Sequence, residues 1–277
     1  MKIKRTIRRI ISDINFLYRY LNSLNRKLPD FLIIGAQKSG TTSLYSFLAQ
    51  HPNITPALKK EVHYFDLNYN RKIKWYRSFF PKTKSTNDQL LNLTGEASPQ
   101  YIFHPHSLYR IKKTLPNVKI IVLLRNPVNR TYSHYQHQVR VGREKLSFED
   151  ALEMEIGRTE DEYNKMLDNN QYNSHNYLMY SYKARSNYYP QIKKCLSIFD
   201  KKNVLIIQAE KFDLEPENQF ARVLNFLGLP NYEINFSKRF NVHKYPPINE
   251  KTKNDLESFF RPYNEKLFDL IGEKFDW

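Results

Sequence analysis

Three short apolar runs, separated by stretches with helical spacing, constrain the fold more than any other feature of this sequence. The runs are Phe31–Gly35, Val118–Leu124 and Val204–Gln208, and each is rich in Ile, Leu and Val. A strand with no polar face is buried on both sides, which is typical of parallel sheets covered by helices. The alternation therefore predicts an α/β fold: a three-layer sandwich with a mainly parallel central sheet.

The remaining elements follow from apolar periodicity and from residues that interrupt helices. A further strand is expected at 90–94, ahead of Gly95. Helices are expected at 41–50, 73–80, 107–114, 127–141, 148–154, 189–199, 217–227 and 251–271. Residues 156–174 are polar and show no repeating apolar face, so we expect a variable loop there. The chain divides into a basic amphipathic helix within residues 1–29 and one domain over residues 30–277.

The chain is strongly basic, with a formal net charge of +16 in 277 residues. A positive field of this size attracts anions and raises the rate at which they encounter the protein. Nucleic acid, an acidic membrane surface, a phosphorylated cofactor and a polyanionic glycan all fit, and charge alone does not choose among them. The single cysteine, Cys195, excludes an intramolecular disulfide and is consistent with a reducing compartment.

The first residues, MKIKRTIRRIISDINFLYRYL, have the basic start of a signal peptide. However, charged residues interrupt every apolar run and no small-residue cleavage site follows, so neither a signal sequence nor a membrane span is expected. The spacing of Ile3, Ile7, Ile10, Ile14 and Leu17 instead predicts an amphipathic helix. Its apolar face either packs on the domain or contacts anionic lipid. We therefore expect a cytoplasmic protein that can lie peripherally on the inner face of the membrane.

The segment FLIIGAQKSGTTSLYSFL is predicted to form a strand, a tight loop and a helix, and it has the composition of an anion site. Gly35 and Gly40 allow the backbone to turn sharply and to approach a ligand closely. The first N–H groups of a helix attract anions, and Lys38 adds a full positive charge. Thr41 and Thr42 add hydroxyl donors. The loop is therefore P-loop-like, and it is suited to one phosphate-like group without a metal.

A second anion site is predicted in the segment VKIIVLLRNPVNRTYSHY. Arg125 follows the strongest predicted strand, and ligands of open α/β sheets bind outside the carboxyl ends of the strands. Its guanidinium suits bidentate contact with a phosphate, and Ser133 would lie about two turns into the next helix. Two anion sites at neighbouring strand ends predict a ligand with two separated anionic groups.

Two other functions are compatible with parts of this pattern. A nucleotide kinase would need its lysine directly after the second glycine of the loop, whereas Lys38 precedes Gly40 here, and it would need an acidic residue to hold magnesium. A polyanion-binding or membrane-surface-binding protein would explain the net charge and the basic start. Neither alternative accounts for both anion sites.

The two anion motifs, in this order and at this spacing, resemble those of the sulfotransferases that use 3′-phosphoadenosine 5′-phosphosulfate (PAPS). The resemblance is strongest to the heparan-sulfate sulfotransferase type, through QKSGTTSLYSFLAQHP, KKEVHYFD, GEASPQYIF, VLLRNPVNRTYSHY, SFEDAL and VLIIQAEKF. It covers nearly all of Phe31–Trp277. It implies an enzyme that moves a sulfuryl group from PAPS to an acceptor hydroxyl or amine, leaves adenosine 3′,5′-bisphosphate (PAP), and uses no metal.

The resemblance also implies roles for single residues of the cofactor site. Contacts to the 5′-phosphosulfate are expected at Lys38, Ser39, Gly40, Thr41 and Thr42, and contacts to the 3′-phosphate at Arg125 and Ser133. Tyr188 matches a tyrosine near the nucleotide. A late Lys-Gly-Arg lid of the family is replaced here by VHKYPPI, in which Lys244, beside His243, is the candidate substitute. Lys38 is the candidate for stabilising charge on the departing phosphate oxygen.

Glu61 in KKEVHYFD matches the general base of the heparan-type enzymes, which takes the proton of the acceptor. His63 is the alternative base, and on a strand the two side chains would point the same way. Acceptor contacts are expected at Lys59, Lys60, Glu96 and Tyr101, although the lysines can instead be solvated and the tyrosine packed in the core. We expect the acceptor to be a glycan, a glycolipid or a small metabolite, with no specific nucleic acid partner.

Overall fold

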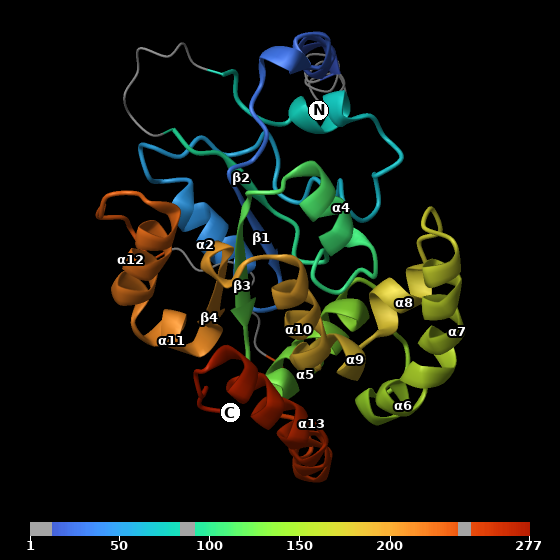
Figure 1. Cartoon of the computed structure of the whole chain (residues 1–277). Coiled ribbons are helices and arrows are strands. Elements are labelled where there is room, and N and C mark those ends of the chain that lie inside the picture. Colours follow the sequence, from blue (N-terminus) through green and yellow to red (C-terminus); the bar gives the residue numbers. More distant parts are fainter. Residues whose placement is uncertain (1–12, 84–91, 238–244) are drawn as a thin grey trace, which may run out of the picture.

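We describe the chain from a computed structural model, which covers residues 13–83, 92–237 and 245–277 and has a four-stranded sheet at its centre (Figure 1). The strands are β1 (Phe31–Gly35), β2 (Gly95–Ala97), β3 (Lys119–Leu124) and β4 (Val204–Gln208). They are ordered β2-β1-β3-β4, and every adjacent pair is parallel. The predicted α/β fold with a parallel central sheet is confirmed.

Helices lie in the connections between the strands and after β4. They are α2 (Thr41–Leu48), α3 (Ile73–Arg77), α4 (Ser107–Thr114), α5 (Pro127–Arg140), α6 (Phe148–Glu153), α7 (Glu155–Asp168), α8 (His175–Tyr180), α9 (Lys183–Ser186), α10 (Tyr188–Ile198), α11 (Ala209–Leu214), α12 (Pro216–Leu227) and α13 (Glu250–Ile271). Pro127 opens α5, where the missing N–H of proline costs no helical hydrogen bond. Gly228 ends α12 in a left-handed conformation that other residues adopt less readily.

Alternate side chains of the strands enter two separate apolar layers, because successive residues of a strand point to opposite faces of the sheet. Phe31 and Ile33 pack with side chains of α2, α11 and α12 on one face. Leu32 and Ile34 pack with side chains of α4, α10 and α13 on the other face. All four strand residues are completely buried, and Figure 1 shows helices on both sides of the sheet. The predicted three-layer sandwich is therefore the observed architecture.

The order of the strands creates a switch point between β1 and β3. From β1 the chain passes to β2 on one side, and β3 then pairs with the opposite edge of β1. Connections that diverge in this way leave a crevice outside the carboxyl ends of the two strands. The loop that follows β1 and the Arg125 side chain that follows β3 both line a cavity at this place.

The position of the edge strand differs from the prediction. We expected a strand at 90–94, but β2 begins at Gly95 and pairs with residues 31–33 of β1. Residues 84–91 lie outside the part of the chain that the structure describes. Gly95 belongs to the strand rather than to a turn because its missing side chain leaves room for the Phe31 ring of β1.

The segment 156–174, predicted as a loop, is mostly helical. Helix α7 covers residues 155–168, and α8 begins at His175. The buried side chains of α7 are Glu155, Thr159 and Met166, so its inward face is largely polar. An inward face of this kind carries no apolar period, which is why the sequence pattern did not indicate the helix.

The chain enters the domain through a helix at residues 13–21, which lies at the amino-terminal end of the sheet (Figure 1). Phe16 of this helix packs on Phe79, with ring centroids 5.1 Å apart. Arg19 donates hydrogen bonds of 2.6 and 2.8 Å to the backbone carbonyls on either side of Phe79. One face of the helix is thus attached to the domain. Among the described residues, no helix combines the length and the apolar character needed to span a membrane.

Gly95→Ala tests the close contact between β2 and β1. A Cβ atom at residue 95 would lie 2.5 Å from the ring of Phe31, which is completely buried. Overpacking of this kind costs about 2 kcal/mol, so we expect Tm to fall by roughly 5 °C in a thermal melt. Gly157→Ala is the matched control, because no atom lies within 4 Å of a Cβ placed there. Equal Tm values for the two variants would contradict the packing described for β2.

Candidate active site

The loop between β1 and α2 forms one wall of a cavity of about 500 Å³ at the carboxyl ends of the strands. Gly40 precedes α2 with φ 87°, a left-handed conformation that glycine adopts without strain. The turn directs the amino-terminal end of α2, with its positive dipole, toward the cavity. The predicted contacts of this loop all line the cavity: Lys38, Ser39, Gly40, Thr41 and Thr42.

Arg125 and Ser133 line the same cavity from β3 and α5. Arg125 directly follows β3, and Ser133 lies two turns into α5 with only 3% of its surface exposed. The Nη1 atom of Arg125 donates a 3.3 Å hydrogen bond to the backbone carbonyl of Lys38, so the two walls are in direct contact. The two predicted anion sites therefore form one continuous site at the switch point of the sheet.

Positive charge is concentrated around Lys38. Burial, together with the charges of the nearby Arg140, Arg125 and Arg130, lowers the pKa of its ammonium group to about 8. The Arg130 guanidinium is completely buried behind the cavity, where it donates to Ser186 Oγ at 2.6 Å and to the Tyr182 carbonyl at 3.0 Å. These cations repel one another, and an anion bound among them would relieve that repulsion.

Part of the cavity lining is aromatic. Phe47 of α2 and Phe212 of α11 lie with their rings nearly parallel, at an angle of 8° and a centroid distance of 6.1 Å. Phe236 meets the edge of Phe47 at 5.0 Å, and all three residues line the cavity. A lining that combines cations with aromatic rings suits a ligand with phosphate groups and a flat base.

The catalytic candidates Glu61 and His63 share an unusual backbone conformation. Among the described non-glycine residues, positive φ angles occur at Lys38 (71°), Glu61 (61°) and His63 (55°). Such angles cost on the order of 1–3 kcal/mol each and cluster at functional sites. Residues 61–63 form no strand, so the strand geometry considered for Glu61 and His63 does not apply. The two side chains nevertheless face each other, with Glu61 Oε2 3.6 Å from His63 Nε2.

The segment around Glu61 is held in place by Glu96 of β2 and by residues that follow this strand. The backbone N–H of Val62 donates to Glu96 Oε2 at 3.1 Å, and that of His63 donates to Ser98 Oγ at 3.3 Å. Ser98 in turn donates to Glu96 at 2.7 Å. Tyr101 donates to the other Glu96 oxygen at 2.9 Å. The end of β2 thus fixes the turn that presents the catalytic candidates.

Two acceptor contacts predicted from the sequence are wrong. Glu96 and Tyr101 are both completely buried, and neither lines the cavity. Burial raises the pKa of Glu96, and hydrogen bonds from Tyr76, Ser98 and Tyr101 partly offset this rise. An alternation of polar and aromatic residues after a strand does not reveal whether they enter the cleft or support it. Glu96 and Tyr101 support the cleft, because they accept hydrogen bonds from the backbone of Val62 and Tyr64, in the segment that follows Glu61.

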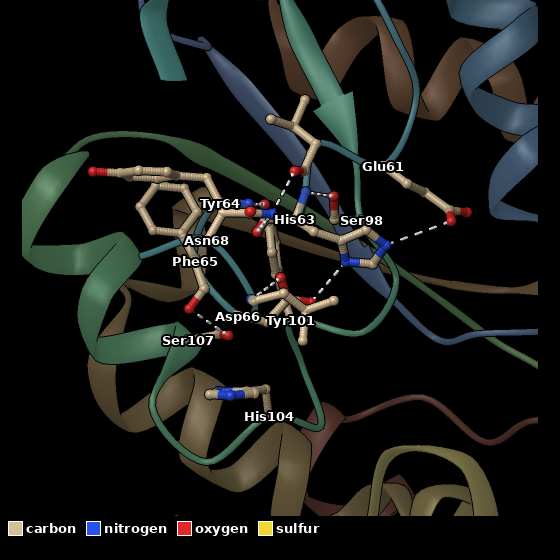
Figure 2. A network of polar contacts seen from close by, with 12 residues as sticks. Glu61, His63, Tyr64, Phe65, Asp66, Asn68, Ser98, Tyr101, His104 and Ser107 are labelled. Atoms are coloured by element: carbon tan, nitrogen blue, oxygen red, sulfur yellow. Dashed lines mark hydrogen bonds and ion pairs between the residues drawn. The ribbon is translucent and has the colours of Figure 1, made fainter. Parts of the chain in front are cut away.

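His63 lies between two carboxylates, as Figure 2 shows. Its Nδ1 atom is 2.8 Å from Asp66 Oδ2, and its Nε2 atom faces Glu61. Burial alone would lower the pKa of His63, but the hydrogen bonds to Asp66 and Glu61 raise it to about 10. His63 is therefore protonated at neutral pH, and a protonated imidazole cannot accept a proton. This geometry favours Glu61 over His63 as the base.

Glu61 lines the same cavity as the Lys38 loop. The hydrogen bond to His63 lowers its pKa to about 2, although burial acts in the opposite direction, and the Lys60 charge lowers it as well. Lys60 Nζ donates directly to Glu61 Oε1. Lys59 is exposed, with its ammonium 5.3 Å from the centre of the Phe79 ring. The sequence analysis treated the two lysines alike, whereas in the structure Lys60 is the one of the two that pairs with Glu61.

The two remaining predicted cofactor residues have different outcomes. Tyr188 lies beneath the cavity, where its hydroxyl donates a 2.9 Å hydrogen bond to the backbone carbonyl of Arg125. It therefore contacts the backbone of Arg125 and does not line the cavity itself. Lys244 and its neighbour His243 lie outside the described residues.

Sequence reasoning missed His137 and Arg140, which also line the cavity. His137 lies one turn after Ser133 on the same face of α5, a spacing that was available in the sequence as a signal. Burial, followed by the charges of Lys38 and Arg140, lowers the pKa of His137 to about 4. His137 is thus neutral at pH 7 and can accept or donate a hydrogen bond in the cleft. The described residues contain no cluster of His, Cys, Asp or Glu that would hold a metal ion.

An open parallel sheet with a cationic, partly aromatic cavity at its switch point and a carboxylate at the rim defines an α/β transferase for an anionic group. Comparison with known proteins gives the family. The chain belongs to the sulfotransferase domain family, which matches residues 28–264. The predicted family and sulfotransferase activity are confirmed.

Individual relatives cover most of the chain. It is 29% identical to the membrane-associated sulfotransferase kil1 of Dictyostelium discoideum, over 90% of this chain and 66% of the relative. It is 27% identical to heparan sulfate glucosamine 3-O-sulfotransferase 6 of Mus musculus, over 91% of this chain and 74% of the relative. A sulfotransferase crystal structure from Alicyclobacillus acidocaldarius superposes with a TM-score of 0.72 and 28% identity, over 90% of this chain and 98% of that one. The chain thus spans about two thirds to three quarters of the length of these two curated relatives.

The raised pKa of His63 predicts a pH-dependent contribution to stability. Because the folded protein holds this proton more tightly than the unfolded chain, the contribution is complete below about pH 6.5 and is lost as pH rises toward 10. We expect His63→Gln to lower Tm most at pH 6 and least at pH 10, measured by thermal melts across that range. His175→Gln, at an exposed position, controls for loss of a surface histidine. A Tm difference for His63→Gln that does not change with pH would contradict the carboxylate pairing.

Proposed function

We propose that this chain transfers a sulfuryl group from PAPS to a hydroxyl or amine of a glycan, with Lys38, Arg125 and Ser133 holding the donor and Glu61 serving as base. The observation that carries the proposal is the convergence of these four residues on one cavity from three separate parts of the chain. Glycolipids and small metabolites are the other acceptors compatible with the cleft. The heparan sulfate enzyme among the relatives supports a glycan.

The chemistry of the cavity fits PAPS. The loop from Lys38 to Thr42 would surround the 5′-phosphosulfate, and Arg125 with Ser133 would hold the 3′-phosphate. The adenine base would then lie toward Phe47, Phe212 and Phe236. When bound, PAPS supplies the sulfuryl group and a phosphate leaving group. The cavity offers separate contacts for the 5′-phosphosulfate, the 3′-phosphate and the base. This supports PAPS over a nucleotide triphosphate, whose phosphates form one consecutive chain.

Each residue of the cleft has a separate role in the proposed reaction. Glu61 accepts the proton of the acceptor hydroxyl or amine while the oxygen or nitrogen of the acceptor bonds to sulfur. Lys38 stabilises the negative charge that develops on the phosphate oxygen when the bond from sulfur to that oxygen breaks. His63, protonated and hydrogen-bonded to Asp66, holds Glu61 ionised and fixes its direction. His137 is placed to contact the acceptor or the sulfuryl oxygens from α5.

The acceptor must displace part of the ion pairing around the base. Lys60 Nζ bonds to Glu61 in the unliganded protein, so it competes with the acceptor proton for the same carboxylate. An acidic group on the acceptor would attract Lys60 and leave Glu61 to the reacting hydroxyl or amine. This exchange supports an acidic glycan over a neutral small molecule.

PAP binding tests the donor site and its protonation. Lys38 has a pKa of about 8 in the free protein, and an anion binds only its charged form tightly. The dissociation constant for PAP, measured by calorimetry, should stay level below pH 8 and rise by up to about tenfold per pH unit above it. Lys38→Arg should remove this pH dependence, since arginine stays charged throughout.

Two controls make the experiment decisive. ADP lacks the 3′-phosphate and should bind more weakly than PAP, and Arg125→Ala should abolish most of that difference. PAP at about 100 times its dissociation constant should also stabilise the fold by roughly 2.7 kcal/mol. Failure of PAP to bind, or equal binding of ADP, would overturn the proposed function.

We further propose that the helix at residues 13–21 contacts a membrane surface. Its outward face carries Ile14, Leu17, Tyr18 and Leu21, which are 51–73% exposed. These positions lie on one side of a helix, and the preceding sequence is rich in lysine and arginine. A relative described as membrane-associated supports the proposal. Attachment through Phe16 and Arg19 leaves this apolar face outward instead of packing it on the domain, the alternative considered from the sequence.

Sedimentation with vesicles tests this contact. Vesicles of phosphatidylserine and phosphatidylcholine should bind the protein, and phosphatidylcholine alone should bind it less. Replacing Leu17 and Leu21 together by Gln removes apolar area from the interface and should weaken binding by at least about tenfold. Leu214→Gln is the matched control, because Leu214 is 81% exposed on α11, outside this helix. Equal sedimentation of all three proteins would exclude the helix as the contact.

A further inference from the structure

The peptide group between Arg125 and Asn126 is held at both of its polar atoms. Its carbonyl accepts the 2.9 Å hydrogen bond from the Tyr188 hydroxyl. Its N–H donates a 2.8 Å hydrogen bond to Glu210 Oε1. This peptide is the point where β3 turns into α5, and the Arg125 side chain that lines the cavity leaves the backbone at its start. Its orientation therefore sets the direction of the Arg125 guanidinium.

Both residues that hold this peptide are in contact with Trp277. The indole N–H of Trp277 donates to Glu210 Oε2 at 3.2 Å. The Trp277 ring lies against the Tyr188 ring, with centroids 6.0 Å apart. Gln208 lies at the end of β4, and its side-chain amide is best satisfied with its oxygen and nitrogen exchanged. In that orientation the amide oxygen accepts from the same indole N–H at 3.2 Å. Trp277 thus reaches the Arg125 peptide from both sides.

Glu210 is otherwise difficult to explain in this place. It lines a cavity that is built to bind anions, where a carboxylate would repel the ligand. Both of its oxygens, however, are occupied by N–H donors, one from the Asn126 backbone and one from Trp277. A carboxylate fixed in this way keeps its charge directed to the backbone, and it orients the peptide that carries Arg125.

We propose that Trp277 is a positioning residue for the 3′-phosphate contact, acting through Glu210 and Tyr188 on the Arg125–Asn126 peptide. The inference rests on the proposed function only in taking PAP as the ligand. Trp277 lines no part of the cavity, so its effect on binding is indirect. It acts on the 3′-phosphate end of the site, whereas the Lys38 loop is attached to a different strand.

The test compares PAP and ADP binding to Trp277→Phe. Phenylalanine retains an aromatic ring against Tyr188 but loses the N–H that holds Glu210. A hydrogen bond to a carboxylate contributes enough for a change of about tenfold, so the dissociation constant for PAP should rise by about that factor. The dissociation constant for ADP, which lacks the 3′-phosphate, should change little. In turnover assays the KM for PAPS should rise more than kcat falls.

Trp75→Phe is the matched control, since Trp75 is the other tryptophan of the sequence and packs on Phe79 near the N-terminal helix. This variant should bind PAP as the native protein does. It also leaves Trp277 as the single tryptophan, so PAP should change the fluorescence of Trp75→Phe and ADP should change it less. A second variant, Glu210→Gln, should weaken PAP binding without adding to the effect of Trp277→Phe in the double variant.

The outcomes separate the two proposals. If the native protein does not bind PAP, the proposed function fails and the role of Trp277 fails with it. If the native protein binds PAP and Trp277→Phe binds it equally well, only the positioning role is overturned. Equal losses of PAP and ADP binding in Trp277→Phe would also overturn it, because they would show a general loss of structure.

Discussion

The buried carboxylate of Glu96 is the interaction on which the catalytic side of the cleft depends. It accepts hydrogen bonds from the Val62 backbone and from the hydroxyls of Tyr76, Ser98 and Tyr101. The residues on either side of Val62 have left-handed backbones, which cost on the order of 1–3 kcal/mol each. An unfavourable conformation persists only where its surroundings fix it. The strand end that carries Glu96 supplies this constraint, so Glu61 is positioned by a residue that does not line the cavity.

The donor side of the cleft is organised by a similar device on different strands. Lys38 also has a left-handed backbone, and its carbonyl accepts from the Arg125 guanidinium. The peptide that follows Arg125 is fixed by Glu210 and Tyr188. Acidic and aromatic residues thus surround a cationic site without neutralising it, because their polar atoms are directed to the backbone. The positive side chains remain oriented toward the cavity.

Much of the cavity lining could be predicted from the sequence, and the residues that support it could not. The loop with Lys38 and the strand end with Arg125 are local motifs, in which neighbouring residues specify both conformation and chemistry. Glu96 and Tyr101 were misplaced because a local pattern does not show which face of a short edge strand meets the cleft. The polar face of α7 and the long-range contact of Trp277 with Glu210 likewise have no local pattern. Such features depend on tertiary packing, which a single sequence does not display.

The position of the helix at residues 13–21 has a consequence for the direction in which the enzyme works. It lies at the amino-terminal end of the sheet, whereas the cavity lies outside the carboxyl ends of the strands (Figure 1). A protein tethered through this helix would open away from the bilayer, with the full height of the sheet between lipid headgroups and base. Short headgroups of that same leaflet would be out of reach. Only long chains, or substrates arriving by diffusion from the aqueous side, would meet the catalytic carboxylate.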